Sequence, residues 1–246
     1  MPDVCTVDRG ARLMFTHGAR SRLTEYDLGR FPGGSLFDRL ARAVCRAGCL
    51  PRKELYEAWE VGRRVRRLFR GGRVVDLAAG HGLLAHVMLL LDDASPAAVA
   101  VDPKPPTSSA RLSAALVDAW PRLAGRVTMV AADAGGVELS GTDVVVSSHA
   151  CGSLTDMILD RAASARARVA VLPCCHHLSS PDAKRLAGWM DGALAIDVAR
   201  ADRLERHGYR IWTQTIAPGI TPKSRLLLGG PADAFNLASH TAHHTD

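Results

Sequence analysis

The segment from Val74 to Ala85 constrains the fold of this chain more than any other part of the sequence. It begins with apolar, β-branched residues, turns through Gly80 and Gly82, and continues as a second apolar stretch. A buried strand, a glycine turn and a helix in this order form the unit from which open, mostly parallel α/β sheets are built. The two glycines allow a tight turn and a close approach of the backbone to a ligand, and Ala85 allows close packing of the helix against the strand.

Short apolar runs continue along the chain, and segments with helical periodicity separate them. The strands they predict span residues 74–78, 99–101, 127–131, 144–147, 169–172, 210–216 and 226–228. Each of the first five precedes a segment compatible with a helix, which is typical of a parallel sheet with crossover helices. Only a loop containing Pro218, Gly219 and Pro222 joins the last two, so these must pair antiparallel. The predicted fold is a Rossmann-like α/β domain with a seven-stranded, mostly parallel sheet that ends in a C-terminal antiparallel hairpin.

Upstream of the first strand, residues 36–69 place apolar side chains at helical spacing, with interruptions at Gly48 and Pro51. We therefore expect an N-terminal helical lead-in over residues 1–70, the α/β domain over 71–230 and a tail over 231–246. The tail is small, polar and rich in histidine, and it is expected to be disordered rather than to bind a metal.

Composition limits the class of protein. A chain of 246 residues, of which 47% are hydrophobic, fits one large domain with a buried core. No apolar run reaches the roughly 18 to 20 residues of a membrane helix, and no secretory signal pattern opens the chain. The six cysteines, with Cys174 and Cys175 adjacent, do not resemble a disulfide framework. We therefore expect a soluble, cytoplasmic protein with reduced thiols and no membrane partner.

The formal net charge of +6 allows an anionic partner such as RNA. Arginine heavily outnumbers lysine in this chain, and a genome rich in G and C is an equally good explanation of that composition. The run from Arg63 to Arg67, with Arg70 and Arg73, could contact phosphates. An exposed helix face is the slightly favoured interpretation of this run.

Two carboxylates indicate the cofactor. Asp102 ends the second predicted strand, about 20 residues beyond the glycines, where an acidic side chain accepts the hydroxyls of an adenosine ribose. Asp76 lies shortly before Gly80 and would repel the pyrophosphate of a nicotinamide cofactor. S-adenosylmethionine (SAM) carries no phosphate but has an ammonium and a sulfonium, so an acid at Asp76 favours SAM over NAD.

Asp133, just beyond the strand predicted at 127–131, is placed to meet the adenine amino group, although a turn aspartate is an equally good interpretation of it alone. The predicted cofactor-binding residues are Asp76, Ala78, Gly80, Gly82, Asp102, Asp133, Ala134 and Ser148.

Polar and soft side chains gather where two further strands end, over residues 147–156 and 173–177. In open α/β sheets the ligand crevice lies beyond the carboxyl ends of the strands, so both clusters are expected to face the same pocket.

The pattern His149-Ala150-Cys151-Gly152 with Thr155-Asp156, followed by Cys174-Cys175-His176-His177, resembles a methyltransferase-domain family. That family includes the eukaryotic tRNA ribose 2′-O-methyltransferases that act on the acceptor stem, and methyltransferase-like proteins of undefined substrate. The resemblance covers residues 74–229 and implies a SAM-dependent methyltransferase domain.

If the acceptor is a ribose hydroxyl, a base must take its proton. We expect His149 to be this catalytic base, with His176 as the next candidate and Asp156 as a residue that orients the base. No metal is expected, because alternate side chains among the four consecutive residues 174–177 point apart and cannot easily converge on one tetrahedral ion. Zinc stays open as an alternative, since Cys151, Cys174, Cys175, His176 and His177 are all zinc-type ligands.

The sequence thus favours a methyltransferase acting on RNA, such as a tRNA. A small-molecule or protein methyltransferase with the same cofactor site is the alternative. A protein that binds SAM or nucleic acid without catalysis is a third interpretation.

Overall fold

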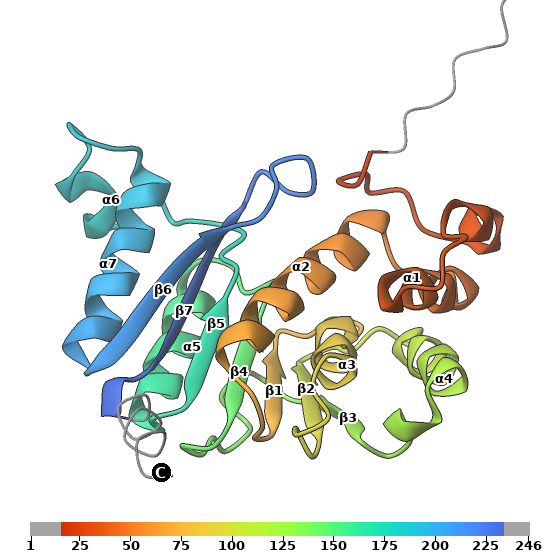
Figure 1. The fold of residues 1–246 in the computed structure, drawn as a ribbon. Coiled ribbons are helices and arrows are strands. Elements are labelled where there is room, and N and C mark those ends of the chain that lie inside the picture. The colour runs from red at the N-terminus through yellow and green to blue at the C-terminus, as the bar shows by residue number, and fades with distance from the viewer. Residues whose placement is uncertain (1–15, 234–246) are drawn as a thin grey trace, which may run out of the picture.

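One mixed sheet organises the protein, and its strand order is β3-β2-β1-β4-β5-β7-β6 (Figure 1). The computed structural model describes residues 16–233. Strands β1 to β5 run parallel, and β7 pairs antiparallel with both β5 and β6. The predicted Rossmann-like fold with its antiparallel hairpin is confirmed. The strands are β1 (Val74–Leu77), β2 (Ala98–Asp102), β3 (Val127–Ala131), β4 (Val144–Ser147), β5 (Arg168–Val171), β6 (Tyr209–Thr215) and β7 (Arg225–Pro231).

Helices cover both faces of the sheet and give three layers. The alternation of side chains along each strand divides the core in two, so Val144 faces one set of helices and Val145 the other. One face packs against α1 (Leu36–Ala47), α2 (Arg52–Leu68), α3 (Leu83–Leu90) and α4 (Ser109–Ala119). The other packs against α5 (Ser153–Ser164) and α7 (Gly192–Arg206), and α6 (Pro181–Arg185) contacts α7. Two short 3-10 helices, η1 (Glu25–Arg30) and η2 (Pro121–Leu123), complete the elements.

The two helices of the lead-in begin and end where local chemistry requires. The Ser35 hydroxyl accepts a hydrogen bond from the Asp38 N–H and caps the start of α1. Gly48 ends α1 with a φ of 59°, a left-handed conformation that glycine adopts without steric cost. Pro51 then stands immediately before α2. Helix α2 crosses the sheet, and the chain then continues into β1 (Figure 1).

One connection differs from the sequence-based prediction. A helix-compatible segment was expected after each of the first five strands, but residues 132–143 between β3 and β4 contain no helix. Gly135, Gly136 and Gly141 weaken helix formation in this short segment. Instead, the chain makes a turn in which the Gly136 N–H donates to the Asp133 carbonyl at 2.8 Å.

Strand β7 continues to Pro231, the first residue of the predicted tail. Residues 234–246, which hold the histidine-rich end for which disorder is predicted, lie outside the described residues. Within residues 16–233, none of the helices combines the length and the apolar character that spanning a bilayer requires.

Candidate functional site

A tight turn joins β1 to α3 at the carboxyl edge of the sheet. Three residues of this turn have positive φ angles, namely Ala78 (58°), Gly80 (53°) and Gly82 (76°). A Cβ atom added to Gly80 would meet no atom within 4 Å, so the backbone here borders open space. A Cβ on Gly82 would lie only 3.0 Å from Met129 and 3.2 Å from Ala100. Gly80 is therefore open to a ligand, whereas Gly82 is required by packing against the sheet.

Asp102, the last residue of β2, is bound to this turn. Its Oδ2 accepts a hydrogen bond from the Gly80 N–H at 2.9 Å, and its Oδ1 accepts one from the Lys104 N–H at 2.9 Å. Each carboxylate oxygen has a further lone pair, and the side chain is only partly buried. Asp102 can therefore accept two more hydrogen bonds from a ligand, as the hydroxyls of a ribose would require.

Asp76 lies beneath the turn rather than beside open space. It is buried, and its Oδ2 accepts a hydrogen bond from the Ala85 N–H at 3.2 Å, at the start of α3. Burial raises the pKa of Asp76 to about 8, and the nearby Asp102 adds to the shift. The observed contact of the Asp76 carboxyl group is with the backbone at the start of α3. Its contact with a charged group of a cofactor stays a prediction.

A narrow crevice of about 10 Å³ runs beside the glycine turn. Two of the predicted residues, Ser148 and His149, line it just beyond β4. His81 lines it too, and its Nε2 lies 2.9 Å from the Ser108 hydroxyl. The other lining residues are Glu54 and Ala58 of α2, with Ala79, Leu83 and Leu84. This crevice is far smaller than the roughly 300–1,000 Å³ typical of ligand pockets.

Sequence reasoning missed Glu54 and His81. Glu54 stands one helical turn before Ala58, so both face the crevice from α2. The neighbouring acids on α2 have other partners. Glu57 is buried beside Lys53, with Oε1 at 2.5 Å from Nζ, and Glu60 pairs with arginines of its own helix.

The predicted adenine-side residues follow β3. Asp133 is exposed, and its carbonyl rather than its carboxylate is used in the turn with Gly136. Ala134 is buried, and its carbonyl accepts a hydrogen bond from Arg161. The Asp133 side chain is thus accessible at the same sheet edge as Asp102.

Asp156 and His176 belong to a second network, on the other face of the sheet. Arg200 of α7 connects them: its Nε lies 2.9 Å from Asp156 Oδ1, and its Nη1 lies 3.2 Å from Asp197 Oδ1. The same Asp197 oxygen lies 2.7 Å from His176 Nε2. Arg225 of β7 also pairs with Asp197, at 2.7 Å.

The electrostatics of this network favour ionised carboxylates. Burial alone would raise the pKa of Asp197, but hydrogen bonds from His176 and Arg225 outweigh it and hold the pKa below its usual value. Arg200 and Arg203 lower the pKa of Asp156 in the same way, against a burial effect that would raise it. Among the described residues, no group lies within hydrogen-bonding distance of His176 Nδ1, which is buried.

The two histidines line different cavities, although one shared pocket was predicted for their segments. His176 lines a cavity of about 180 Å³ with Asp197, Lys223 and Arg225, whereas His149 lines the crevice at the glycine turn. The segments themselves are adjacent, because Cys151 and Cys175 form an isolated parallel bridge.

Three thiols meet at that junction. The Sγ atoms of Cys151, Cys174 and Cys175 all lie within 4.8 Å of one another. Cys151 Sγ and Cys174 Sγ are 2.7 Å apart, and Cys174 Sγ lies 3.7 Å from the His149 carbonyl. Burial, together with the neighbouring thiols, raises the pKa of Cys174.

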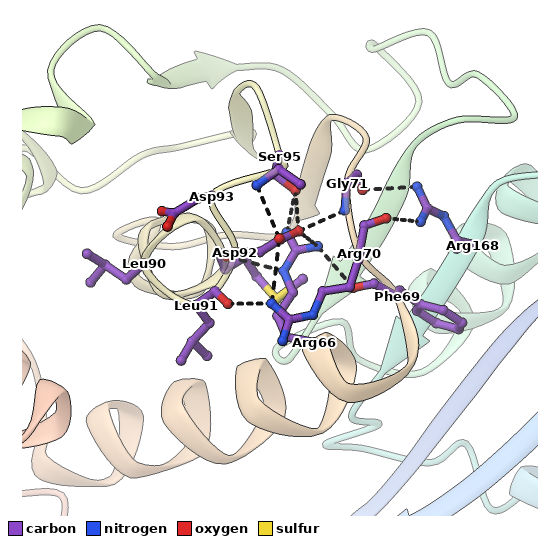
Figure 2. A network of polar contacts seen from close by, with 12 residues as sticks. Arg66, Phe69, Arg70, Gly71, Leu90, Leu91, Asp92, Asp93, Ser95 and Arg168 are labelled. Carbon is purple, nitrogen blue, oxygen red and sulfur yellow. Dashed lines mark hydrogen bonds and ion pairs between the residues drawn. The ribbon is translucent and has the colours of Figure 1, made fainter.

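Several arginines of the basic run at the end of α2 pair with acidic groups, and Figure 2 shows the network around Arg66 and Arg70. Arg66 is buried, pairs with Asp92 at 3.0 Å and donates to the Phe69 carbonyl at 3.1 Å. Arg70 pairs with Asp92 at 3.5 Å, and Arg73 pairs with Asp143 at 2.7 Å. Because α2 leads into the amino end of β1, these groups lie at the sheet edge opposite the glycine turn.

The residues around the glycine turn fit SAM chemically. Asp102 retains acceptor capacity for ribose hydroxyls, the open side of Gly80 permits close approach, and the crevice walls supply Ser148 and His149. Asp133 is exposed beyond the neighbouring strand.

Residues 63–181 match a family model described as a methyltransferase domain. No curated protein matches the chain. Among solved structures, the precorrin-6y C5,15-methyltransferase of Geobacter metallireducens is 16% identical, with 70% of this chain and 86% of that chain covered at a TM-score of 0.46. An O-methyltransferase family protein from Burkholderia thailandensis is 16% identical, with coverage of 85% and 69% and a TM-score of 0.47. The tRNA (uracil-54, C5)-methyltransferase of Pyrococcus abyssi is 17% identical, with coverage of 72% and 38% and a TM-score of 0.43.

Proposed function

We propose that this chain is a SAM-dependent methyltransferase that acts on a structured RNA, with a ribose hydroxyl as the acceptor. The match of residues 63–181 to a methyltransferase domain supports the reaction class. The proposal that the cofactor is SAM depends on one observation above all. Asp102 accepts a hydrogen bond from the Gly80 N–H at 2.9 Å and keeps acceptor capacity toward the open side of the turn.

SAM, when bound, supplies a methyl group on a positively charged sulfur. Asp102 would hold the ribose of the cofactor, and Asp133 would hold its adenine amino group. The backbone of Ala78, Gly80 and Gly82 would contact the rest of the cofactor molecule. Ala134 and Ser148 would line the same site. Asp76 would hold the turn in shape through the Ala85 N–H.

Charge around the crevice supports an anionic acceptor. The net charge is +6, and the exposed Arg22 and Arg111 lie close enough to His81 to act on its charge state. Lys104, next to Asp102, is also exposed. These groups, rather than the run at the end of α2, lie at the carboxyl edge of the sheet, where phosphates of an RNA would meet them.

We assign to His149 the role of the base that takes the proton from the acceptor hydroxyl. Its side chain is exposed and lines the crevice beside the glycine turn, so a hydroxyl placed there would be within its reach. A positioned base of this kind contributes on the order of 10² to 10⁴ in rate. His176, held by Asp197, is the second candidate, and Asp156 supports it only through Arg200.

The substrate class is tested by incubating the protein with methyl-labelled SAM and separated cellular RNA, protein and small-metabolite fractions. The expected result is label in RNA, and in its ribose after hydrolysis to nucleosides. Label in the protein or metabolite fraction instead would support the alternative acceptors and contradict the RNA assignment. Binding of SAM without transfer to any fraction would contradict catalysis.

The base is tested with His149→Ala, and the exposed neighbour His177→Ala is the matched control. The expected loss of turnover in His149→Ala is on the order of 10² or more, with little change in His177→Ala. Unchanged turnover in His149→Ala and a large loss in His176→Ala would move the role to His176.

A further inference from the structure

Cys151, Cys174 and Cys175 form a compact group of thiols drawn from two separate segments. Cys151 precedes α5, and Cys174 and Cys175 follow β5. The segments are held together independently of the thiols, because Cys151 and Cys175 form a backbone bridge and the Gly152 N–H donates to the Cys175 carbonyl at 3.2 Å. The backbone thus brings the three sulfur atoms to within 4.8 Å of one another.

This spacing suits a tetrahedral metal ion. Three sulfurs bound to zinc at about 2.3 Å lie about 3.8 Å apart at tetrahedral angles. The sulfur separations here run from 2.7 Å between Cys151 and Cys174 to no more than 4.8 Å, so small side-chain rotations reach that geometry. His176 does not join the group, because its Nε2 is bonded to Asp197.

We propose that the three thiolates of Cys151, Cys174 and Cys175 bind one zinc ion. Thiolate is a soft ligand that selects zinc over magnesium or calcium. Each thiol releases its proton to solvent as its bond to zinc forms. Cys151 and Cys175 are exposed, so the fourth position faces outward and takes water or another external ligand.

The position of this zinc site gives it a structural role, which is separate from the proposed methyl transfer. The ion joins the segment that carries His149 to the segment that carries His176, at the sheet edge where both are presented. Its role is therefore to fix two segments that the fold otherwise connects through a short backbone bridge.

The test uses the full-length protein, prepared under reducing conditions and freed of metal. Zinc is added and unbound ion is removed by gel filtration, and metal content is measured per chain. In parallel, cobalt(II) is titrated as a spectroscopic probe, because bound thiolates give an intense charge-transfer absorption. The expected result is one ion per chain and a cobalt spectrum typical of several thiolate ligands.

Variants identify the ligands. Cys151→Ser and Cys175→Ser change exposed side chains, so both are expected to fold, as circular dichroism can check. Each should weaken zinc binding by roughly 100-fold or more, which exceeds most losses from partners outside the ligand set. Cys49→Ser, which changes a buried thiol between α1 and α2, should bind zinc as the wild type does.

Two results would overturn the proposal. The first is a metal content near zero with no thiolate absorption on cobalt addition. The second is a Cys151–Cys174 disulfide, found by peptide mass mapping, in protein that binds no metal after reduction; the pair would then be a redox couple.

Discussion

His176 Nε2 and Asp197 Oδ1 lie 2.7 Å apart, and they join the segment after β5 to helix α7. Asp197 also pairs with Arg200 and Arg225, and Arg200 is almost completely buried. A single carboxylate therefore holds a histidine and two arginines that come from three elements.

Replacing Asp197 with alanine should destabilise the protein by about 1–3 kcal/mol, because it removes the acceptor for His176 and Arg225 and leaves Arg200 paired with Asp156 alone. Urea unfolding measures the change. Asp202→Ala on the same helix removes an exposed pair with Arg206 and should leave the unfolding free energy unchanged. Equal effects of the two substitutions would show that the Asp197 network contributes little to stability.

Asp92 is the centre of the polar network in Figure 2. It is buried, pairs with Arg66 at 3.0 Å and accepts from the Gly71 N–H at 2.8 Å. Asp92→Ala should cost about 3–5 kcal/mol, since it leaves Arg66 as an unpaired buried charge. Its neighbour Asp93 has an 86% exposed side chain, so Asp93→Ala is the matched control and should have little effect. Thermal or urea unfolding of both variants distinguishes a structural network from a surface cluster.

The sequence predicted the strands well because their signals are local. Runs of β-branched residues and the loop between β6 and β7 determine which segments pair and in which direction. The missing helix between β3 and β4 shows the limit of such local signals. The glycines within residues 132–143 favour turns over a helix.

The candidate site was predictable where it depends on the glycine turn, and less so elsewhere. Asp102 meets Gly80 because Gly80 lies in the turn after β1 and Asp102 ends β2, the neighbouring parallel strand. The pairing of His176 with Asp197 depends on how α7 packs against the sheet, and no local pattern contains that information. The burial of Asp76 and the convergence of Cys151 with Cys174 likewise follow from tertiary packing.

Ala78 has a φ of 58°, a conformation that costs an L-residue about 1–2 kcal/mol. Ala78→Gly relieves this cost, and the greater freedom of glycine in the unfolded chain offsets about 0.4–1 kcal/mol of the gain. The variant should therefore be as stable as the wild type or slightly more stable. The adjacent Ala79→Gly, at a residue without positive φ, should lose about 1 kcal/mol. Urea unfolding compares the two, and a larger loss in Ala78→Gly would show that its backbone conformation is not strained.

Burial raises the pKa of Asp76 to about 8, whereas an unfolded aspartate titrates near 3.9. Between these values the folded protein holds one more proton, so stability falls as pH rises and the contribution is lost as pH passes about 8. Asp76→Asn should remove this part of the pH dependence. Urea unfolding at several pH values between about 5 and 8 measures the two slopes. Parallel slopes for wild type and variant would show that Asp76 is ionised throughout.

Calorimetric titration of the purified protein with S-adenosylhomocysteine, and separately with NADH, tests the cofactor assignment most directly. We predict that S-adenosylhomocysteine binds, that NADH does not, and that Asp102→Asn weakens the binding by about tenfold or more through lost hydrogen bonds to a charged group. Uptake of NADH without uptake of S-adenosylhomocysteine would contradict the assignment of the glycine turn to SAM.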